Sequence, residues 1–190
     1  VKEAFYKQFD NLCRHAVISL LTAQRLHQEM VPRPFLSSCN ENCMATGKDL
    51  SQGGAKYNVG PVITGIGLAV VANSLAAVRK LVFEDKVCDM ETLAKALQAN
   101  WEGYEDLRNY ILNDMPRYGN DIEEVDELTG WAMGVFAEAF NNCSCYRVNR
   151  CQAGIYPVST HIMFGMNSWA TPDGRKAGEP LSDGISPKQG

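Results

Sequence analysis

The stretch G-I-Y-P-V-S-T-H-I-M-F-G, residues 154–165, and the loop A-T-P-D-G-R-K-A-G-E-P, residues 170–180, decide the interpretation of this chain. The first stretch is a run of β-branched and aromatic residues between two glycines, which is typical of a strand buried on at least one face. The second mixes Pro, Gly and Asp with charged residues, which indicates turns and not helix. A strand that runs into an ordered loop is a common place for a binding wall, although most such strands are only core.

The composition indicates a globular protein with one core, or with part of a larger one. Of the 190 residues, 45% are apolar and 21% are charged. The net charge of −4, with both signs mixed along the chain, argues against nucleic acid as a main partner. No apolar run has the length of a membrane span, and no signal peptide is recognisable. Seven cysteines without a dense framework favour a reducing cytoplasm.

The two ends of the sequence predict a piece of a longer chain. Val1 lies inside a helical pattern without a preceding Met, and Gly190 lies inside a loop. The sequence shows no internal repeat and no low-complexity linker. We therefore expect residues 1–190 to form a single segment of one domain, incomplete at both ends.

Helical periodicity dominates the first three quarters of the chain. The first helix has an apolar stripe of Phe5, Phe9, Leu12, Ala16 and Leu20. Asn120 and Glu123 have the spacing of a capping box at the start of a long helix. The other expected helices cover residues 35–50, with Gly47 as C-cap, 65–83, 90–100 and 104–113.

Two adjacent glycines, Gly53 and Gly54, begin the segment Gly53-Gly54-Ala55-Lys56-Tyr57-Asn58. Two adjacent glycines allow a positive φ or a close approach of backbone. A phosphate cradle would need the Lys-Ser/Thr ending of a P-loop, which is absent. We expect a tight structural turn.

The cysteines and histidines show no pattern of a metal or nucleophilic site. Cys143, Cys145 and Cys151 have no second Cys pair and no nearby histidine. Cys39 and Cys43 are four residues apart and would share one face of a single helix. One of them as a nucleophile is the alternative, but no flanking base is visible, so we expect buried structural thiols. The histidines without catalytic spacing are His15, His27 and His161. We expect no metal.

Several segments, in their order along the chain, resemble glycyl radical enzymes, the family of pyruvate formate-lyase and its dehydratase and lyase relatives. The segments are P-F-L-S-S (34–38), G-K-D-L (47–50), G-G-A-K-Y-N (53–58), G-L-A (67–69), N-S-L-A-A-V (73–78), Y-G-N-D (118–121), V-D (125–126) and T-P-D-G-R-K-A-G-E-P-L-S-D-G-I-S-P (171–187). The G-G-A-K-Y-N form and the P-V-S-x-H run at 157–161 are more similar to the dehydratase and C–X lyase branch than to pyruvate formate-lyase itself.

The resemblance implies an α/β fold: part of a ten-stranded barrel, mostly helical in this segment. It also implies two loops inside the barrel, one with a thiyl-forming Cys in G-C-x-E and one with the radical Gly in an R-V-x-G-like motif. Neither motif is present here. Cys39 has Glu41 two residues on but lacks the preceding Gly, so the catalytic role is not carried to it. The glycyl radical is therefore expected outside these residues, with no metal or organic cofactor here, and the chain alone is expected to be inactive.

Within the expected strand 154–164, alternation puts Tyr156, Val158 and Thr160 on one face. The resemblance implies that this face lines the substrate pocket. A core tyrosine whose hydroxyl bonds the backbone is the alternative for Tyr156. The residues expected to have structural roles in loops are Gly53, Gly54, Tyr57, Asn58, Asp173 and Arg175.

Three hypotheses about function remain open. The first is an anaerobic glycyl radical dehydratase or lyase that cleaves a C–O, C–N, C–S or C–C bond of a small molecule. The second is formate C-acetyltransferase, with pyruvate and coenzyme A as substrates, and the third is a truncated, non-catalytic interaction module. For the enzyme, the resemblance implies activation by a radical-SAM enzyme, a homodimer and a cytoplasmic location, without nucleic acid or membrane.

Overall fold

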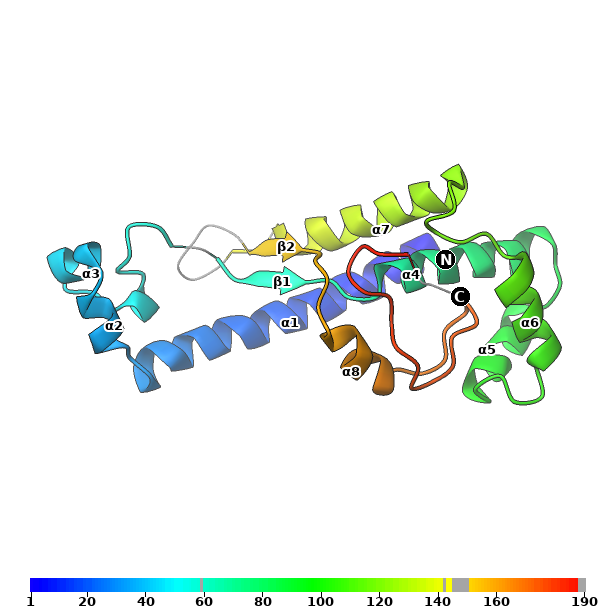
Figure 1. The fold of residues 1–190 in the computed structure, drawn as a ribbon, viewed down its shortest axis with the longest axis horizontal. Helices are drawn as coiled ribbons and strands as arrows, with labels where there is room; N and C mark the ends of the chain where they lie inside the picture. The colour runs from blue at the N-terminus through cyan, green and yellow to red at the C-terminus, as the bar shows by residue number, and fades with distance from the viewer. Residues whose placement is uncertain (59, 142, 145–150, 188–190) are drawn as a thin grey trace. The chain divides into compact units, whose positions relative to one another are not determined.

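The computed structural model describes residues 1–58, 60–141, 143–144 and 151–187, and most of this part of the chain is helical (Figure 1). The chain divides into two compact units, which are described in turn: Val1–Ile63 with Val135–Gly154, and Thr64–Gly134 with Ile155–Gly190. In chain order, the elements are α1 (Lys2–Met30), α2 (Pro34–Ser38), α3 (Glu41–Thr46), the 3₁₀ turn η1 (Leu50–Gln52), β1 (Val62–Thr64), α4 (Leu68–Val78), the π-helical segment η2 (Arg79–Glu84), α5 (Met90–Gln98), α6 (Glu105–Asp114), α7 (Glu123–Asn141), β2 (Gln152–Gly154) and α8 (Thr160–Met166).

In the first unit, α1 confirms the helix predicted for residues 1–30, and its predicted stripe is right in part: Phe5, Phe9 and Leu20 are partly buried, whereas Leu12 and Ala16 are exposed. Cys13 and Val17 are buried. The ring centroid of Phe9 lies 6.2 Å from that of Phe136 in α7. Periodicity alone does not separate two adjacent faces of a helix, and the covered face of α1 includes Cys13 and Val17 together with Phe9.

The single helix predicted over residues 35–50 is wrong, because the chain breaks it in two. Cys39 ends α2, and the side-chain oxygen of Asn40 accepts a hydrogen bond from the backbone N–H of Cys43 at the start of α3. Cys39 is exposed and Cys43 is buried, so the two thiols do not share a helix face. Gly47 follows α3 with a φ of +65°, which confirms its predicted role as C-cap.

β1 and β2 form a two-stranded sheet and run in the same direction (Figure 1). The backbone N–H of Gln152 donates to the carbonyl oxygen of Pro61 over 3.0 Å at the start of this pairing. Parallel neighbours need a long connection between them, and the chain has one. The described residues show these two strands alone, so the ten-stranded barrel stays a prediction.

In the second unit, α4 is the covered helix that its small and apolar residues predict. Ala69, Ala72 and Ala77 have 0% of their surface exposed. Although α4 is apolar, no helix in the described ranges has both the length and the apolar character needed to cross a membrane. The largest core cluster of this unit draws on α4, η2, α5, α6 and the loop after α8: Ala77, Val78, Leu81, Leu93, Ala96, Trp101, Ile111, Met115 and Ala170.

The capping box predicted at Asn120 is wrong. α7 begins at Glu123, and Asn120 donates instead through Nδ2 to the carbonyl oxygen of Arg117 over 3.3 Å. Gly119 and Asp121 have φ angles of +92° and +57°. Left-handed conformations do not continue a right-handed helix, so the chain turns here before α7 starts.

The strand predicted over residues 154–164 is wrong beyond Gly154. Residues 155–158 have no regular structure, and α8 begins at Thr160. Strand alternation therefore does not place Thr160 on a face shared with Tyr156 and Val158. A Cβ on Gly165 would lie 2.3 Å from the carbonyl oxygen of Glu179, so α8 packs directly on that backbone. This packing outweighs the β propensity of the apolar run.

Candidate functional site

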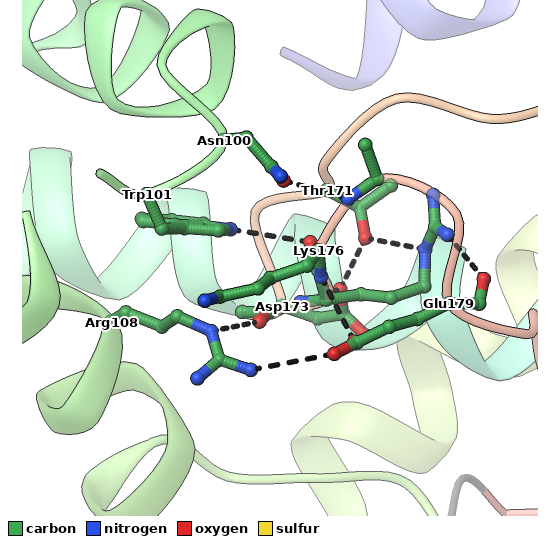
Figure 2. A network of polar contacts seen from close by, with 10 residues as sticks. Asn100, Trp101, Arg108, Thr171, Asp173, Lys176 and Glu179 are labelled. Atoms are coloured by element: carbon green, nitrogen blue, oxygen red, sulfur yellow. Dashed lines mark hydrogen bonds and ion pairs between the residues drawn. The ribbon is translucent and has the colours of Figure 1, made fainter.

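The side chain of Arg175 is 0% exposed. Figure 2 shows the loop Thr171–Glu179 that carries it, with Thr171, Asp173 and Glu179 among the labelled residues. The Arg175 guanidinium donates to the backbone carbonyl oxygens of Trp169 and Glu179, the second over 2.6 Å. Its Nε donates to Thr171 Oγ1 over 3.2 Å, and that hydroxyl donates to Asp173 Oδ1 over 2.5 Å. Burial lowers the pKa of Arg175, and the nearby carboxylates of Asp173 and Glu179 oppose the change. Asp173 and Arg175, the residues expected to be structural, thus lie at the centre of this network.

The turn between α5 and α6, together with Arg108 in the first turn of α6, also holds this loop (Figure 2). Trp101 Nε1 donates to the carbonyl oxygen of Arg175 over 3.2 Å, and Arg108 Nε donates to that of Gly174 over 2.8 Å. The backbone N–H of Ala177 donates to Asn100 Oδ1 over 2.8 Å. All three bonds involve the backbone of the loop, so they fix the path of the chain. The sequence analysis missed these partners because they lie 66–77 residues away along the chain.

Residues 155–158 join β2 to α8 and carry two of the three residues expected to line a substrate pocket. Tyr156 is 50% exposed, and Val158 is partly buried. Thr160, the third residue, is exposed at the start of α8. Gly184 lies against this segment, because a Cβ there would be 2.9 Å from the carbonyl carbon of Tyr156.

Two side chains that the sequence analysis did not select hold the backbone of Val158. The N–H of Val158 donates to Asp183 Oδ1 over 2.9 Å, and His161 Nδ1 lies 2.8 Å from the carbonyl oxygen of Val158. A cavity of about 520 Å³ adjoins these side chains, and its lining includes His161, Ser182, Asp183 and Ser186. Asp183 follows Leu-Ser and precedes Gly, which indicates only a turn, so no local signal identified it.

The glycine pair of the first unit has both of the backbone properties expected of it. Gly53 has a φ of +81°, and a Cβ on Gly54 would lie 2.1 Å from the carbonyl oxygen of Lys48. Asn58 Nδ2 donates to the carbonyl oxygens of Gly53 and Ala55, over 3.2 and 2.8 Å. Tyr57 is exposed and borders a cavity of about 240 Å³ whose lining also includes Gln24, His27, Arg33 and Asn58.

The cysteines do not form a reactive site in the described residues. Burial raises the pKa of the Cys13 thiol to about 11, and the carboxylate of Asp10 adds to the change. Such a thiol stays protonated and unreactive. Cys151 is disulfide-bonded, which the sequence analysis did not predict, and Cys145 lies outside the described residues. In the part of the chain that the structure describes, no three His, Cys, Asp or Glu residues form a group that would hold a metal ion.

Comparison with known proteins agrees with the resemblance in the sequence. The pyruvate formate lyase-like family model matches residues 1–165. The chain is 36% identical over 192 residues to trans-4-hydroxy-L-proline dehydratase of Clostridioides difficile, covering 99% of this chain and 24% of that protein. It is 42% identical over 135 residues to isethionate sulfite-lyase of Bilophila wadsworthia, covering 66% of this chain and 15% of that protein.

A solved structure extends the likeness to three dimensions. The glycerol-bound B12-independent glycerol dehydratase of Clostridium butyricum matches with a TM-score of 0.91 and 37% identity, over 100% of this chain and 24% of that chain. The chain thus spans about a quarter of the length of such relatives. The chain belongs to the pyruvate formate lyase-like family of glycyl radical enzymes, on its dehydratase and lyase branch.

Proposed function

We propose that this chain forms part of a glycyl radical enzyme that cleaves a C–O, C–N, C–S or C–C bond of a small molecule, as a dehydratase or a lyase. The observation that carries the proposal is likeness along the whole chain to one functional branch. It includes 36% identity over 99% of the chain to a hydroxyproline dehydratase and a TM-score of 0.91 with a glycerol dehydratase.

In this proposal the reactive groups belong to other parts of the protein. The glycyl radical, which would lie outside these residues, would supply the hydrogen-atom abstraction that starts the reaction of the substrate. These 190 residues contain neither the G-C-x-E nor the R-V-x-G-like motif, and Cys39 is an exposed thiol at the end of α2. No radical step is therefore assigned to this chain. The proposal includes a radical-SAM activating enzyme as partner, a homodimer and a cytoplasmic location.

The contribution proposed for this chain is one wall of the substrate cavity, formed by Tyr156 and Val158 with Thr160 at its edge. Tyr156 offers a phenolic hydroxyl to a substrate hydroxyl, carboxylate or headgroup, and Val158 offers an apolar contact that excludes water. Two observations support this role. The segment is the loop that follows a strand, a common position for binding residues, and half of the Tyr156 surface is exposed among the described residues.

The test uses the full-length protein that carries this sequence, activated without oxygen by its radical-SAM partner. Electron paramagnetic resonance would quantify the glycyl radical, and product analysis would follow a substrate panel of glycerol, trans-4-hydroxy-L-proline, isethionate, and pyruvate with coenzyme A. We expect a glycyl radical and turnover of a substrate without coenzyme A. Formate production that requires coenzyme A would establish the acetyltransferase instead, and absence of both radical and turnover would favour the non-catalytic module.

A further inference from the structure

Two side chains bond the backbone of Val158, which lies outside the regular elements. Residues 155–158 belong to no helix or strand, so the polar groups of their peptide bonds have no regular ladder to join. Buried or partly buried backbone N–H and C=O groups require partners. The partner of the Val158 N–H is a side chain 25 residues further along the chain, and the Val158 carbonyl oxygen is shared by the side chain and the backbone N–H of His161.

Asp183 provides the acceptor. Its Oδ1 accepts the Val158 N–H over 2.9 Å, and the side chain of Asp183 is 37% exposed. The next residue, Gly184, has a φ of +54°, and a Cβ there would lie 2.9 Å from Pro157 N. The carboxylate and the glycine thus bring the chain after α8 into direct contact with residues 156–158.

His161 provides the donor. A carbonyl oxygen only accepts, so the proton between His161 Nδ1 and the Val158 carbonyl oxygen, 2.8 Å apart, lies on the nitrogen. The backbone N–H of His161 also donates to this oxygen over 3.3 Å. Both the neutral Nδ1–H tautomer and the imidazolium keep this donor, and Asp183 Oδ1 lies 3.6 Å from the same nitrogen.

A third bond ties the two partners to each other. The backbone N–H of Leu181 donates to the carbonyl oxygen of His161 over 3.2 Å, two residues before Asp183. The tight contact of Gly165 with the backbone of Glu179, Pro180 and Leu181 supports the same strip of chain. Residues 179–184 therefore form a fixed backing for the Val158 peptide.

We propose that His161 and Asp183 are a positioning pair that clamps the Val158 peptide and thereby sets the direction in which Tyr156 and Val158 face the substrate. The inference rests on the proposed function, because the segment that the pair clamps is the proposed substrate wall. His161 and Asp183 do not touch the reacting atoms; they act through the backbone of residues 156–158.

The clamp is tested first without any need for activity. Hydrogen exchange, followed by mass spectrometry of peptides that cover residues 155–159, is compared in the full-length protein and in Asp183→Ala, Asp183→Asn and His161→Asn. We expect exchange at Val158 to become about tenfold faster or more in Asp183→Ala, because the N–H loses its acceptor. Asp183→Asn keeps a hydrogen-bond acceptor at position 183, and His161→Asn keeps a donor near the position of Nδ1. In both variants we therefore expect the Val158 N–H to exchange at the rate of the parent protein. Asp126→Ala, an exposed aspartate of α7 in the same unit, is the control.

Unchanged exchange in Asp183→Ala would overturn the clamp, and so would equal acceleration of exchange in Asp183→Ala and Asp126→Ala. Equally accelerated exchange at Val158 in Asp183→Ala and Asp183→Asn would also overturn the clamp, because the Asn side chain still accepts a hydrogen bond.

Kinetics then separate the clamp from the proposed function. In the activated protein we expect Asp183→Ala to lower kcat/KM by about tenfold or more with the same glycyl radical content, and Asp183→Asn to stay within about threefold of the parent. Faster exchange together with unchanged kcat/KM would retain the clamp of the peptide but overturn its role in setting the substrate wall. Absence of radical and of turnover in the parent itself would instead count against the proposed function.

Discussion

At the scale of single residues, the buried guanidinium of Arg175 is the group whose removal we expect to destabilise the protein most. It holds two carbonyl oxygens and one hydroxyl from the loop that it belongs to. Arg175→Met removes the guanidinium that these acceptors bond and that lies near the Asp173 carboxylate. We expect the free energy of unfolding to fall by about 3 kcal/mol. Urea unfolding followed by tryptophan fluorescence measures the change.

Lys176→Met is the matched control for that prediction, because it removes a cation from the exposed neighbour. We expect its effect to stay within about 0.5 kcal/mol. If the two variants were equally stable, the network around Arg175 would not be a structural support.

Asp49 gives a prediction about pH. Its carboxylate accepts bonds from the Ser37 hydroxyl (2.6 Å) and from the backbone N–H groups of Ser51 (2.8 Å) and Arg33 (2.9 Å). These bonds, the one from Ser37 first, hold the pKa of Asp49 well below its usual range. A lowered folded-state pKa stabilises the protein above the unfolded-state pKa of about 3.9, and this contribution disappears as the pH falls toward the folded-state value.

We therefore expect Asp49→Asn to be less stable than the parent at pH 7, and the gap to narrow below about pH 5. Unfolding curves at a series of pH values from 7 to 3 measure this gap, with the exposed Asp114→Asn as control. A gap that widens toward low pH would contradict the assignment.

At the scale of the elements, Gly165 decides how α8 packs. A Cβ there would lie 2.3 Å from Glu179 O and 2.6 Å from Pro180 Cα, both backbone atoms that cannot rotate away. We expect Gly165→Ala to lower the free energy of unfolding by about 1–3 kcal/mol. Gly130 lies inside α7 with open space around its Cβ position, so Gly130→Ala should instead raise stability by about 0.5–1 kcal/mol. Thermal denaturation compares the two, and a stabilising Gly165→Ala would show that α8 does not pack as described.

Elements with a long periodic pattern could be predicted from the sequence, and short ones could not. The ends of α1, α5 and α6 lie within two residues of the predicted ends. An apolar stripe that repeats over several turns is compatible with a helix and not with a strand. The strand predicted for residues 154–164 is wrong because β-branched and aromatic residues are compatible both with a strand and with a short, packed helix. The decisive feature, the contact of Gly165 with Glu179, is tertiary.

The same limit applies to the candidate site. Tyr156 and Val158 were selected through resemblance to a family, and the sequence carried that signal. His161 and Asp183 were not selected, because the hydrogen bond from Val158 N to Asp183 Oδ1, 2.9 Å long, joins residues 25 apart in the chain and is visible only in the folded structure. Trp101 and Arg108 were missed for the same reason, since their acceptors lie in a loop more than 60 residues away.

At the scale of the whole molecule, we propose that this chain supplies the support and one wall of a cavity whose reactive residues belong to other parts of the protein. The chain covers about a quarter of relatives such as the hydroxyproline and glycerol dehydratases. A radical intermediate needs a site from which water and oxygen are excluded, and the buried core and clamped loops of the second unit suit such a rigid support.

The most direct test of this account is steady-state kinetics of Tyr156→Phe in the activated full-length protein, with the glycyl radical counted in the same samples. Tyr6→Phe, which removes the same hydroxyl from an exposed position of α1, is the control. The account predicts an unchanged radical content and a kcat/KM lower by about tenfold or more in Tyr156→Phe alone, because the substrate loses a hydrogen bond. A kcat/KM equal to that of Tyr6→Phe would contradict it.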